Sequence, residues 1–256
     1  MTQLIRSIMI IFVIFQFYNC AELLNGKDDS KDKDNLTALG LAFLVGAGSC
    51  PSTEISAQPT NGTAYDFTKC SGSVASALGS AGFSGSNVSL VSGIAGTSAT
   101  STIITNASRL SSTGGEKKAS IEITYVLSAS DSTLDVIMPS STSFTGPTFQ
   151  ISTTDIKKKN PSGVVSALTT AGTWSSSLGT EKILCLEVHQ ENGAHLFGWT
   201  GSCATVNRGS YTFEDEDSVS GFDFSGDKIA VKINKATIKS MKIYSANIGT
   251  AGNILF

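Results

Sequence analysis

The strongest constraint on the fold is the alternation of apolar and polar residues in the chain beyond Pro51. Short segments of this kind are separated by clusters of Ser, Gly, Asn and Asp, with almost no helical periodicity. A period of two places successive side chains on opposite faces of a β-strand. Within residues 119–129 the regularly spaced apolar positions are Ile121, Ile123, Tyr125 and Leu127. We therefore predict an all-β domain over residues 50–256, an antiparallel β-sandwich of two packed sheets.

Three pairs of strands are predicted as hairpins. The second pair flanks Asn192-Gly193, a dipeptide that is typical of tight hairpin turns. The three predicted pairs are 119–129 with 133–138, 182–190 with 196–200, and 228–234 with 237–245. Several hairpins without intervening helices favour two packed antiparallel sheets.

The amino terminus has the pattern of an export signal. Residues 1–6 contain one cation, Arg6, and no acid, and the stretch from Ser7 to Phe17 is almost wholly apolar. This apolar run is about half as long as the roughly 20 residues that a bilayer-spanning helix needs. We predict a cleaved signal peptide over residues 1–19, with a permanent transmembrane helix as the alternative.

Residues 20–49 are predicted to lead from the signal to the sandwich. Residues 25–35 contain no apolar side chain, so residues 20–35 are expected to form a flexible polar tether that begins at Cys20. Residues 36–49 are predicted as a short apolar helix, too short to span a bilayer. We expect this helix to dock on the domain or lie at a lipid interface, with a partner-binding helix as the alternative.

The residues around Cys20 resemble a known processing site. Phe17-Tyr18-Asn19-Cys20-Ala21 is similar to the relaxed lipobox of spirochaetal lipoproteins, although the usual eubacterial lipobox has Leu, a small residue and then Gly or Ala before the cysteine. The charged segment and short apolar run that follow are similar to leptospiral surface lipoproteins. This resemblance implies acylation of Cys20 and an outer-membrane lipoprotein exposed at the cell surface, which two or more acyl chains would anchor firmly.

The four remaining cysteines form an even set in an exported chain, which favours disulfides. They are Cys50, Cys70, Cys185 and Cys203, and they allow three connectivities. We favour the local pairs, Cys50 with Cys70 and Cys185 with Cys203, because each closes a loop of about twenty residues beside turn-forming residues. A metal site is not expected, since no CxxC spacing occurs and His189 and His195 are the only histidines.

A second resemblance concerns the sandwich itself. The patterns of residues 120–124, 134–137 and 236–244 are similar to those of concanavalin-like and laminin-G-like jelly-roll domains. That resemblance implies binding of sugar or matrix protein. Nothing in the sequence looks like a nucleic-acid surface, because the only basic run is Lys157-Lys158-Lys159, which we interpret as a solvated turn.

The hairpin around Asn192-Gly193 carries the candidate ligand site. If Cys185 lies opposite Cys203, then His189 lies opposite Trp199. Leu184, Leu186 and Val188 would then face the core, leaving Trp199, His189 and Glu187 on the outer face. An exposed indole beside a carboxylate and an imidazole would suit a sugar ring. The alternative is that Trp199 packs under a loop or over the disulfide.

No motif predicts an enzyme or a cofactor. The segment from Glu187 to Glu191 is similar to the Glu-x-Asp-x-Glu strand of retaining β-glucanases, but His189 replaces the Asp. On a regular strand the two glutamates would lie about 13 Å apart, whereas retention needs carboxyl groups within about 5.5 Å. Neither histidine lies in a Gly-x-Ser-x-Gly elbow.

The acidic residues 214–217, with Asp223 and Asp227, suggest a calcium loop. Their spacing does not match an EF-hand, so we favour a solvated acidic turn, with a calcium loop of another kind as the alternative. Taken together, the sequence predicts a membrane-anchored, non-enzymatic module that binds glycan or a host or matrix protein. The alternative is a structural envelope lipoprotein that faces the periplasm and has no soluble ligand.

Overall fold

A computed structural model describes the part of the chain that follows the predicted helix. The described residues are 48–56, 61–109, 111–113, 116–160, 162–170, 178–190, 193–207, 211–219, 222 and 224–244. The predicted signal peptide, Cys20, the tether and nearly all of the short helix lie outside these residues. Residues 48–256 form one compact unit. Within the described ranges, no helix is both long and apolar enough to cross a bilayer.

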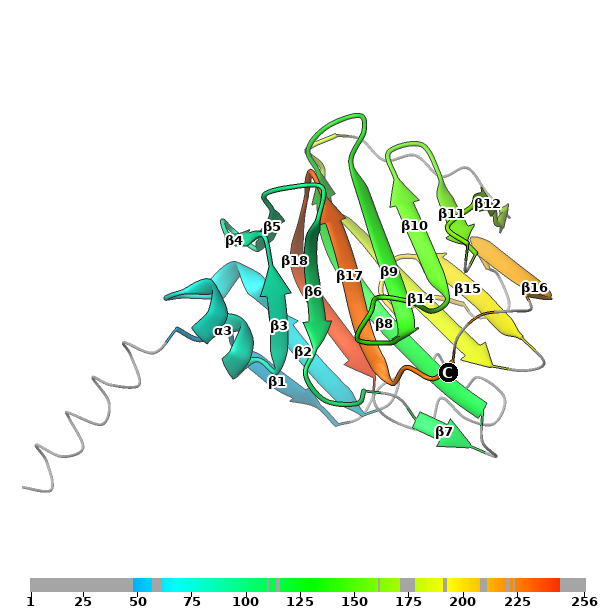
Figure 1. The fold of residues 1–256 in the computed structure, drawn as a ribbon, viewed down its shortest axis with the longest axis horizontal. Coiled ribbons are helices and arrows are strands. Elements are labelled where there is room, and N and C mark those ends of the chain that lie inside the picture. The colour runs from blue at the N-terminus through cyan, green and yellow to red at the C-terminus, as the bar shows by residue number, and fades with distance from the viewer. Residues whose placement is uncertain are drawn as a thin grey trace, which may run out of the picture. The chain divides into compact units, whose positions relative to one another are not determined.

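The described residues form two antiparallel sheets, which Figure 1 shows as stacked layers. The main path of the first sheet is β1 (Ser52–Ile55), β2 (Gly62–Asp66), β18 (Ala236–Tyr244), β8 (Glu116–Leu127), β14 (Lys182–Gln190), β15 (Ala194–Thr200), β16 (Phe213–Val219) and β13 (Thr169–Thr170). Three short strands extend this sheet: β4 (Val88–Leu90), β5 (Ile94–Gly96) and β7 (Ser111–Thr113). The predicted all-β sandwich is therefore confirmed.

The second sheet is smaller and completes a jelly-roll-like sandwich. Its order is β12 (Val165–Ala167), β11 (Ile156–Lys159), β10 (Thr148–Ser152), β9 (Thr133–Ser140), β17 (Lys228–Asn234), β6 (Ser101–Thr105) and β3 (Phe83–Ser86). The helical elements among the described residues are η1 (Phe67–Lys69) and α3 (Val74–Ser80), which begins with the side chain of Ser73 accepting a hydrogen bond from the backbone N–H of Ser76. The sheets thus account for nearly all of the regular structure described.

The core lies between the sheets and follows the alternation in the sequence. In β8, Ile121, Ile123 and Tyr125 are fully buried in this core. In the second sheet, the residues that face it include Leu134, Val136, Met138, Phe149, Ile151, Val231 and Ile233. Burial of this much aliphatic and aromatic surface provides the main favourable term in folding.

Only one of the three predicted hairpins is confirmed. β14 and β15 pair across the turn that contains Gly193. β8 and β9 do not pair with each other, because β8 belongs to the first sheet and β9 to the second, and the same holds for β18 and β17. Only Lys235 separates β17 from β18, whereas the commonest tight hairpins need two loop residues. The chain therefore crosses between the sheets at both places.

The two crossings meet in one hydrogen-bonded unit, which we call the paired corner, made of residues 128–132 and Lys235. The carbonyl oxygen of Lys235 accepts a hydrogen bond from the backbone N–H of Ser128 at 3.0 Å. The fully buried Ser132 hydroxyl donates to the same carbonyl oxygen and accepts from the N–H groups of Ser128 and Ala129, at 3.1 and 2.9 Å. Lys235 has a left-handed backbone, with φ of 49°, which lets the chain turn sharply.

Both predicted disulfides are present, Cys50 with Cys70 and Cys185 with Cys203. The first joins the start of the described region to the end of η1. Beside it, the buried rings of Tyr65, Phe67 and Phe83 pack together, with centroids 4.9 to 6.0 Å apart. The second disulfide ties the outer face of β14 to the segment that follows β15.

The paired corner yields a stability prediction. We expect Ser132→Ala to lower the free energy of unfolding by about 1–3 kcal/mol, because the half-buried N–H of Ala129 loses its hydrogen-bond partner and the Lys235 carbonyl loses one of its two donors. The matched control is Ser130→Ala, on the same turn but exposed, which should change stability by less than about 0.5 kcal/mol. Urea unfolding of the full chain measures both. Equal effects of the two variants would contradict a special role for the corner.

Candidate functional site

The register of the β14–β15 hairpin differs from the predicted one. Cys185 lies opposite Trp199, and His189 lies opposite His195. The predicted pairing of His189 with Trp199 is therefore wrong. The turn is tighter than predicted, since Gln190 already pairs with Ala194, and Cys203 lies beyond the strand in a turn that folds back. The predicted core positions Leu184, Leu186 and Val188 are confirmed as buried in the main core.

Trp199 lies on the outer face of the first sheet, but it is not an exposed platform. Only 1% of its surface is accessible. The segment after β15 covers it, and Trp199 packs with Phe197, Tyr211 and Val206 beside the Cys185–Cys203 disulfide. The centroids of the Trp199 and Tyr211 rings are 5.2 Å apart. The prediction of an open sugar-binding indole is wrong, and the alternative of packing under a loop and over the disulfide is confirmed.

The other two predicted ligand residues lie beside this covered region. Glu187 is fully buried, with its carboxylate 3.4 Å from the hydroxyl of Ser120 and 3.7 Å from Nδ1 of His189. The rings of His189 and His195 stack across the two strands, with centroids 5.0 Å apart. The structure thus keeps Glu187, His189 and Trp199 on one face but leaves no open surface around the carboxylate or the indole.

A second buried carboxylate, that of Glu122, holds the covering segment in place. It accepts hydrogen bonds from the hydroxyl of Ser202 at 2.6 Å and from the N–H of Cys203 at 2.9 Å. It also forms an ion pair with Lys242 at 2.7 Å. Burial, together with the negative charge of Glu122, raises the pKa of the Tyr244 hydroxyl above its ordinary value. The Glu122 carboxylate on the outer face of the first sheet therefore holds the segment that covers Trp199.

The lysine run is a strand, not the solvated turn that we predicted. Lys157 to Lys159 belong to β11, so alternate side chains point to opposite faces. Lys158 points inward and pairs with the nearly buried Asp215 of β16 in the first sheet. Lys159 points outward and pairs with Asp135 of β9 at 2.9 Å. Each charge has a partner, because an unpaired charge at a partly buried position is costly.

The acidic segment 214–227 does not form a solvated turn over its whole length. Its first part lies in β16, and Asp215 is held by Lys158. Asp223 lies outside the described residues. Within the described part of the chain, no group of three acidic, histidine or cysteine side chains is placed to hold a metal ion.

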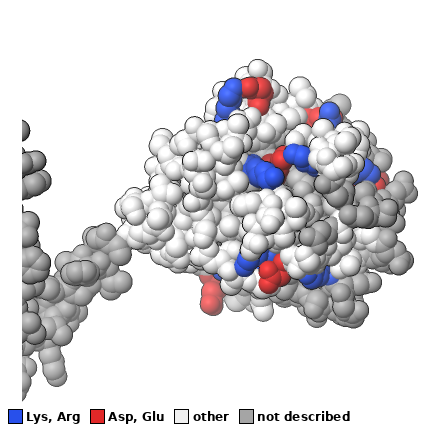
Figure 2. All heavy atoms as spheres, in the orientation of Figure 1, with Lys and Arg blue, Asp and Glu red and all other residues white. Residues whose placement is uncertain are grey.

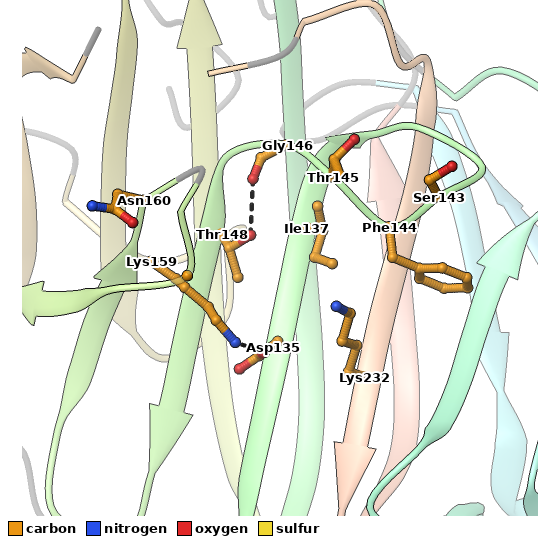
Figure 3. Close-up of a pocket in the computed structure, with 11 residues that line it drawn as sticks. Asp135, Ile137, Ser143, Phe144, Thr145, Gly146, Thr148, Lys159, Asn160 and Lys232 are labelled. Atoms are coloured by element: carbon orange, nitrogen blue, oxygen red, sulfur yellow. Dashed lines mark hydrogen bonds and ion pairs between the residues drawn. The ribbon is translucent and has the colours of Figure 1, made fainter. Parts of the chain in front are cut away.

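A hollow lies over the outer face of the second sheet. It has a volume of about 370 Å³, within the range of about 300–1,000 Å³ that is typical of small-molecule sites. Its floor is formed by Asp135, Ile137, Thr148, Lys159 and Lys232. Its walls are formed by Ser143, Phe144, Thr145 and Gly146 from the β9–β10 loop, and by Asn160 and Gly163. Figure 3 shows these side chains around the hollow.

The β9–β10 loop is held by its own polar groups. The backbone N–H of Phe144 donates to the carbonyl of Ser141 at 3.1 Å, and the hydroxyl of Ser141 contacts that of Thr145 at 2.6 Å. Gly146 is required at the end of the loop, because its φ is 150° and a Cβ there would lie 1.9 Å from the carbonyl oxygen of Pro139. The loop therefore presents Phe144 in a fixed place.

Phe144 itself has an unusual backbone. Its φ of 59° lies in the left-handed region, which a bulky residue rarely adopts. Such a conformation costs on the order of 1–2 kcal/mol for a residue with a side chain. Strained residues of this kind cluster at binding and catalytic sites. Phe144 is half-buried and lines the hollow, so the left-handed backbone supports a positioned aromatic residue there.

The floor of the hollow contains one carboxylate between two amines. Asp135 accepts a hydrogen bond from Nε2 of Gln150 at 3.0 Å and forms an ion pair with Nζ of Lys159 at 2.9 Å. Lys232 lies directly opposite Asp135 in the register of β17 and β9. Figure 2 shows that this face of the molecule is mostly uncharged, with basic and acidic atoms gathered in a few places. The hollow is one of the places where charge collects.

Sequence reasoning missed this hollow. Asp135 was predicted within a strand, and Lys159 was assigned to a solvated turn. The available signal was Phe144, a lone aromatic residue in the Ser/Thr/Gly/Pro segment of residues 140–148 between two strands. An aromatic side chain in such a loop has no alternating pattern to bury it, which indicates a binding role more strongly than Trp199 did.

Comparisons with known proteins give no family. No protein-family model matches the chain, and no curated protein matches its sequence. Among solved structures, it is similar to the carbohydrate recognition domain of Emp46p in its metal-free form, at 14% identity and a TM-score of 0.41, over 65% of this chain and 89% of that chain.

Two further solved structures are similar at the same low level. The carbohydrate-binding module CBM66 from Bacillus subtilis is 9% identical, with a TM-score of 0.32, over 78% of this chain and 92% of that chain. The GH43 protein BlXynB from Bacillus licheniformis is 12% identical, with a TM-score of 0.39, over 72% of this chain and 39% of that chain. Likenesses this distant assign no ligand residue, so the hollow is interpreted from its own chemistry.

The burial of Trp199 yields the second prediction. We expect Trp199→Ala to lower the free energy of unfolding by about 3–5 kcal/mol, as other aromatic truncations in cores do. Trp199→Phe is the control and should cost clearly less, since it keeps a ring and removes an indole N–H that has no partner among the described residues. Urea unfolding measures both. In a Trp174→Phe background, two results together would contradict the burial of Trp199. They are ready quenching of Trp199 fluorescence by iodide and only a small loss of unfolding free energy in Trp199→Ala.

Proposed function

We propose that the domain is a non-enzymatic carbohydrate-binding module and that the hollow on the second sheet is its ligand site. The observation that carries this proposal is the left-handed Phe144, an aromatic residue that lines a hollow of about 370 Å³ together with polar side chains. A sugar ring has an apolar face and a rim of hydroxyl groups, so it needs an aromatic surface beside several hydrogen-bonding groups. The hollow offers both in one place.

The polar groups of the hollow suit the rim of a sugar. Asp135 can accept hydrogen bonds from hydroxyl groups, and the lysines can donate to them. The hydroxyl of Thr148 donates to the carbonyl of Gly146 at 2.9 Å, which leaves its oxygen able to accept. These groups belong to strands and to a well-bonded loop, so little ordering is needed on binding.

The arrangement favours binding over hydrolysis. Glycoside hydrolases generally use a pair of carboxyl groups on either side of the scissile bond. Among the residues that line the hollow, Asp135 is the one carboxylate, and Lys159 and Gln150 already hold it. A carboxylate held in this way is suited to position a hydroxyl group of a ligand.

We further propose that lipid on Cys20 anchors this module to an outer membrane, with the domain facing outward. The support is the order of segments in the sequence: a signal-like stretch, the lipobox-like residues before Cys20, and a polar tether. The ligands would include glycans on host or matrix proteins, because the hollow would contact only the sugar. Proteolysis of intact cells tests the orientation, since a periplasmic domain would be shielded from added protease.

The role of Phe144 is tested by Phe144→Gly. This change should abolish binding to a glycan array, because the ring is lost. It should alter the free energy of unfolding by less than about 1 kcal/mol, because relief of the left-handed strain offsets the lost contacts. Ser92→Gly is the matched control, since Ser92 is an exposed left-handed residue outside the hollow, with φ of 50°. It should bind as the unaltered chain does.

Two outcomes of this experiment would contradict the proposal. One is that the unaltered chain binds no member of an array of neutral and acidic oligosaccharides. The other is that Phe144→Gly binds as well as the unaltered chain. Phe144→Tyr keeps a ring and should retain most of the binding, which separates loss of the aromatic surface from a general disturbance of the loop.

The lipid anchor is tested by Cys20→Ser in cells. We expect this change to remove labelled palmitate from the protein and to move it from the detergent phase to the aqueous phase, because the acylated side chain is missing. Cys50→Ser, paired with Cys70→Ser, is the control, and its labelling should persist. Palmitate incorporation into Cys20→Ser at the unaltered level would contradict the lipoprotein proposal.

A further inference from the structure

The hollow has an imbalance of charge that bears on the kind of sugar it would hold. Its lining contains two lysines, Lys159 and Lys232, and one aspartate, Asp135. Both oxygens of the aspartate have partners, since Oδ1 accepts from Gln150 and Oδ2 pairs with Lys159. One lysine charge is therefore neutralised within the site. The charge of the other lysine is left over.

Lys232 carries that remaining charge. It projects from the middle of β17 and is half-buried. Figure 3 shows its amine rising toward the hollow, while the amine of Lys159 reaches Asp135. Across the described residues, Lys232 has no ion pair, although Asp135 lies opposite it in the register. A partly desolvated ammonium without a counter-charge favours an anion from outside the chain.

The position of Lys232 also determines which part of a ligand it would meet. It lies on the floor of the hollow, whereas Phe144 comes from the wall. A ligand whose apolar face rests on the Phe144 ring would therefore point a substituent toward Lys232. A carboxylate is the substituent that gains most there, because charge-assisted hydrogen bonds to an ammonium are about twice as strong as neutral ones.

We propose that the hollow selects acidic sugars, with Lys232 binding a ring carboxylate of the uronic-acid type. This inference rests on the proposed carbohydrate-binding function and names its ligand class. Asp135 acts as a positioning residue, because it holds Lys159 at one side of the floor and leaves Lys232 to the ligand. A neutral sugar would leave the Lys232 charge without a partner in a half-buried site. A cationic ligand would meet two ammonium groups.

The experiment compares trigalacturonic acid with its methyl ester, which has the same rings without the charge. Isothermal titration calorimetry of the full chain should show the acid binding about tenfold tighter or more at low salt. Added salt should weaken binding of the acid toward that of the ester, because the surface charges become screened. Lys232→Met should bind the acid about tenfold more weakly, so that the preference for the acid over the ester is lost.

Two further variants control this result. Lys69→Met removes the same charge from η1, where the side chain is 70% exposed and lies outside the hollow. It should leave the preference for the acid intact. Lys232→Arg keeps the charge and should keep the preference, so it tests the role of charge even if Lys232→Met proves unstable in thermal unfolding.

The outcomes separate this inference from the function on which it rests. If the acid and its ester bind equally and Lys232→Met has no effect, the selection for acidic sugars is overturned while carbohydrate binding stands. If neither form binds, the acidic-sugar inference falls, and the glycan array then decides whether carbohydrate binding falls with it. Tighter binding of the acid that is lost in Lys232→Met and kept in Lys69→Met supports the inference.

Discussion

The paired corner is the contact on which the rest of the sandwich depends. At this point β8 passes into β9 and β17 passes into β18, so both sheets are entered from one bonded unit. The corner fixes the register in both directions, with Ala236 opposite Leu127 in the first sheet and Asn234 opposite Thr133 in the second. Two residues further along the second sheet, the same register brings Lys232 opposite Asp135. The charges of the hollow are thus placed by a hydrogen-bonded turn at the end of the strands.

The two outer faces of the sandwich use their polar groups in different ways. On the first sheet, Glu122 binds the backbone and hydroxyl of the segment that covers Trp199. On the second sheet, Asp135 bonds only to groups of its own face, and the hollow above it stays open. Similar carboxylates therefore stabilise a closed surface in one case and organise an accessible one in the other. The open surface that could hold a ligand therefore lies on the second sheet and not beside Trp199.

Much of the fold follows from local pattern, and the site does not. The alternation at Ile121, Ile123 and Tyr125 predicts a strand with one buried face, because burial of a pleated strand requires it. The same alternation cannot distinguish a hairpin from a crossing, and only the single residue between β17 and β18 carries that information. Trp199 was assigned to the correct face, but its cover depends on contacts between Glu122 and residues about 80 positions away. The hollow brings together Asp135 of β9, Lys159 of β11 and Lys232 of β17, and the first two of these are 24 positions apart in the sequence.

The lysine run of β11 has a consequence for how this edge of the sheet is aligned. Because the last three residues of this strand are all lysines, a shift that moves each residue one position toward the place of Asn160 would still offer an ammonium group to Asp215 on one side and to Asp135 on the other. The ion pairs therefore cannot tell the correct alignment from its neighbour. That information lies in the two residues that flank the lysines: Ile156 is buried in the core, and the side chain of Asn160 accepts hydrogen bonds from Ser162 and Val164. A mutation at either end would loosen the alignment of a strand whose middle remains unchanged.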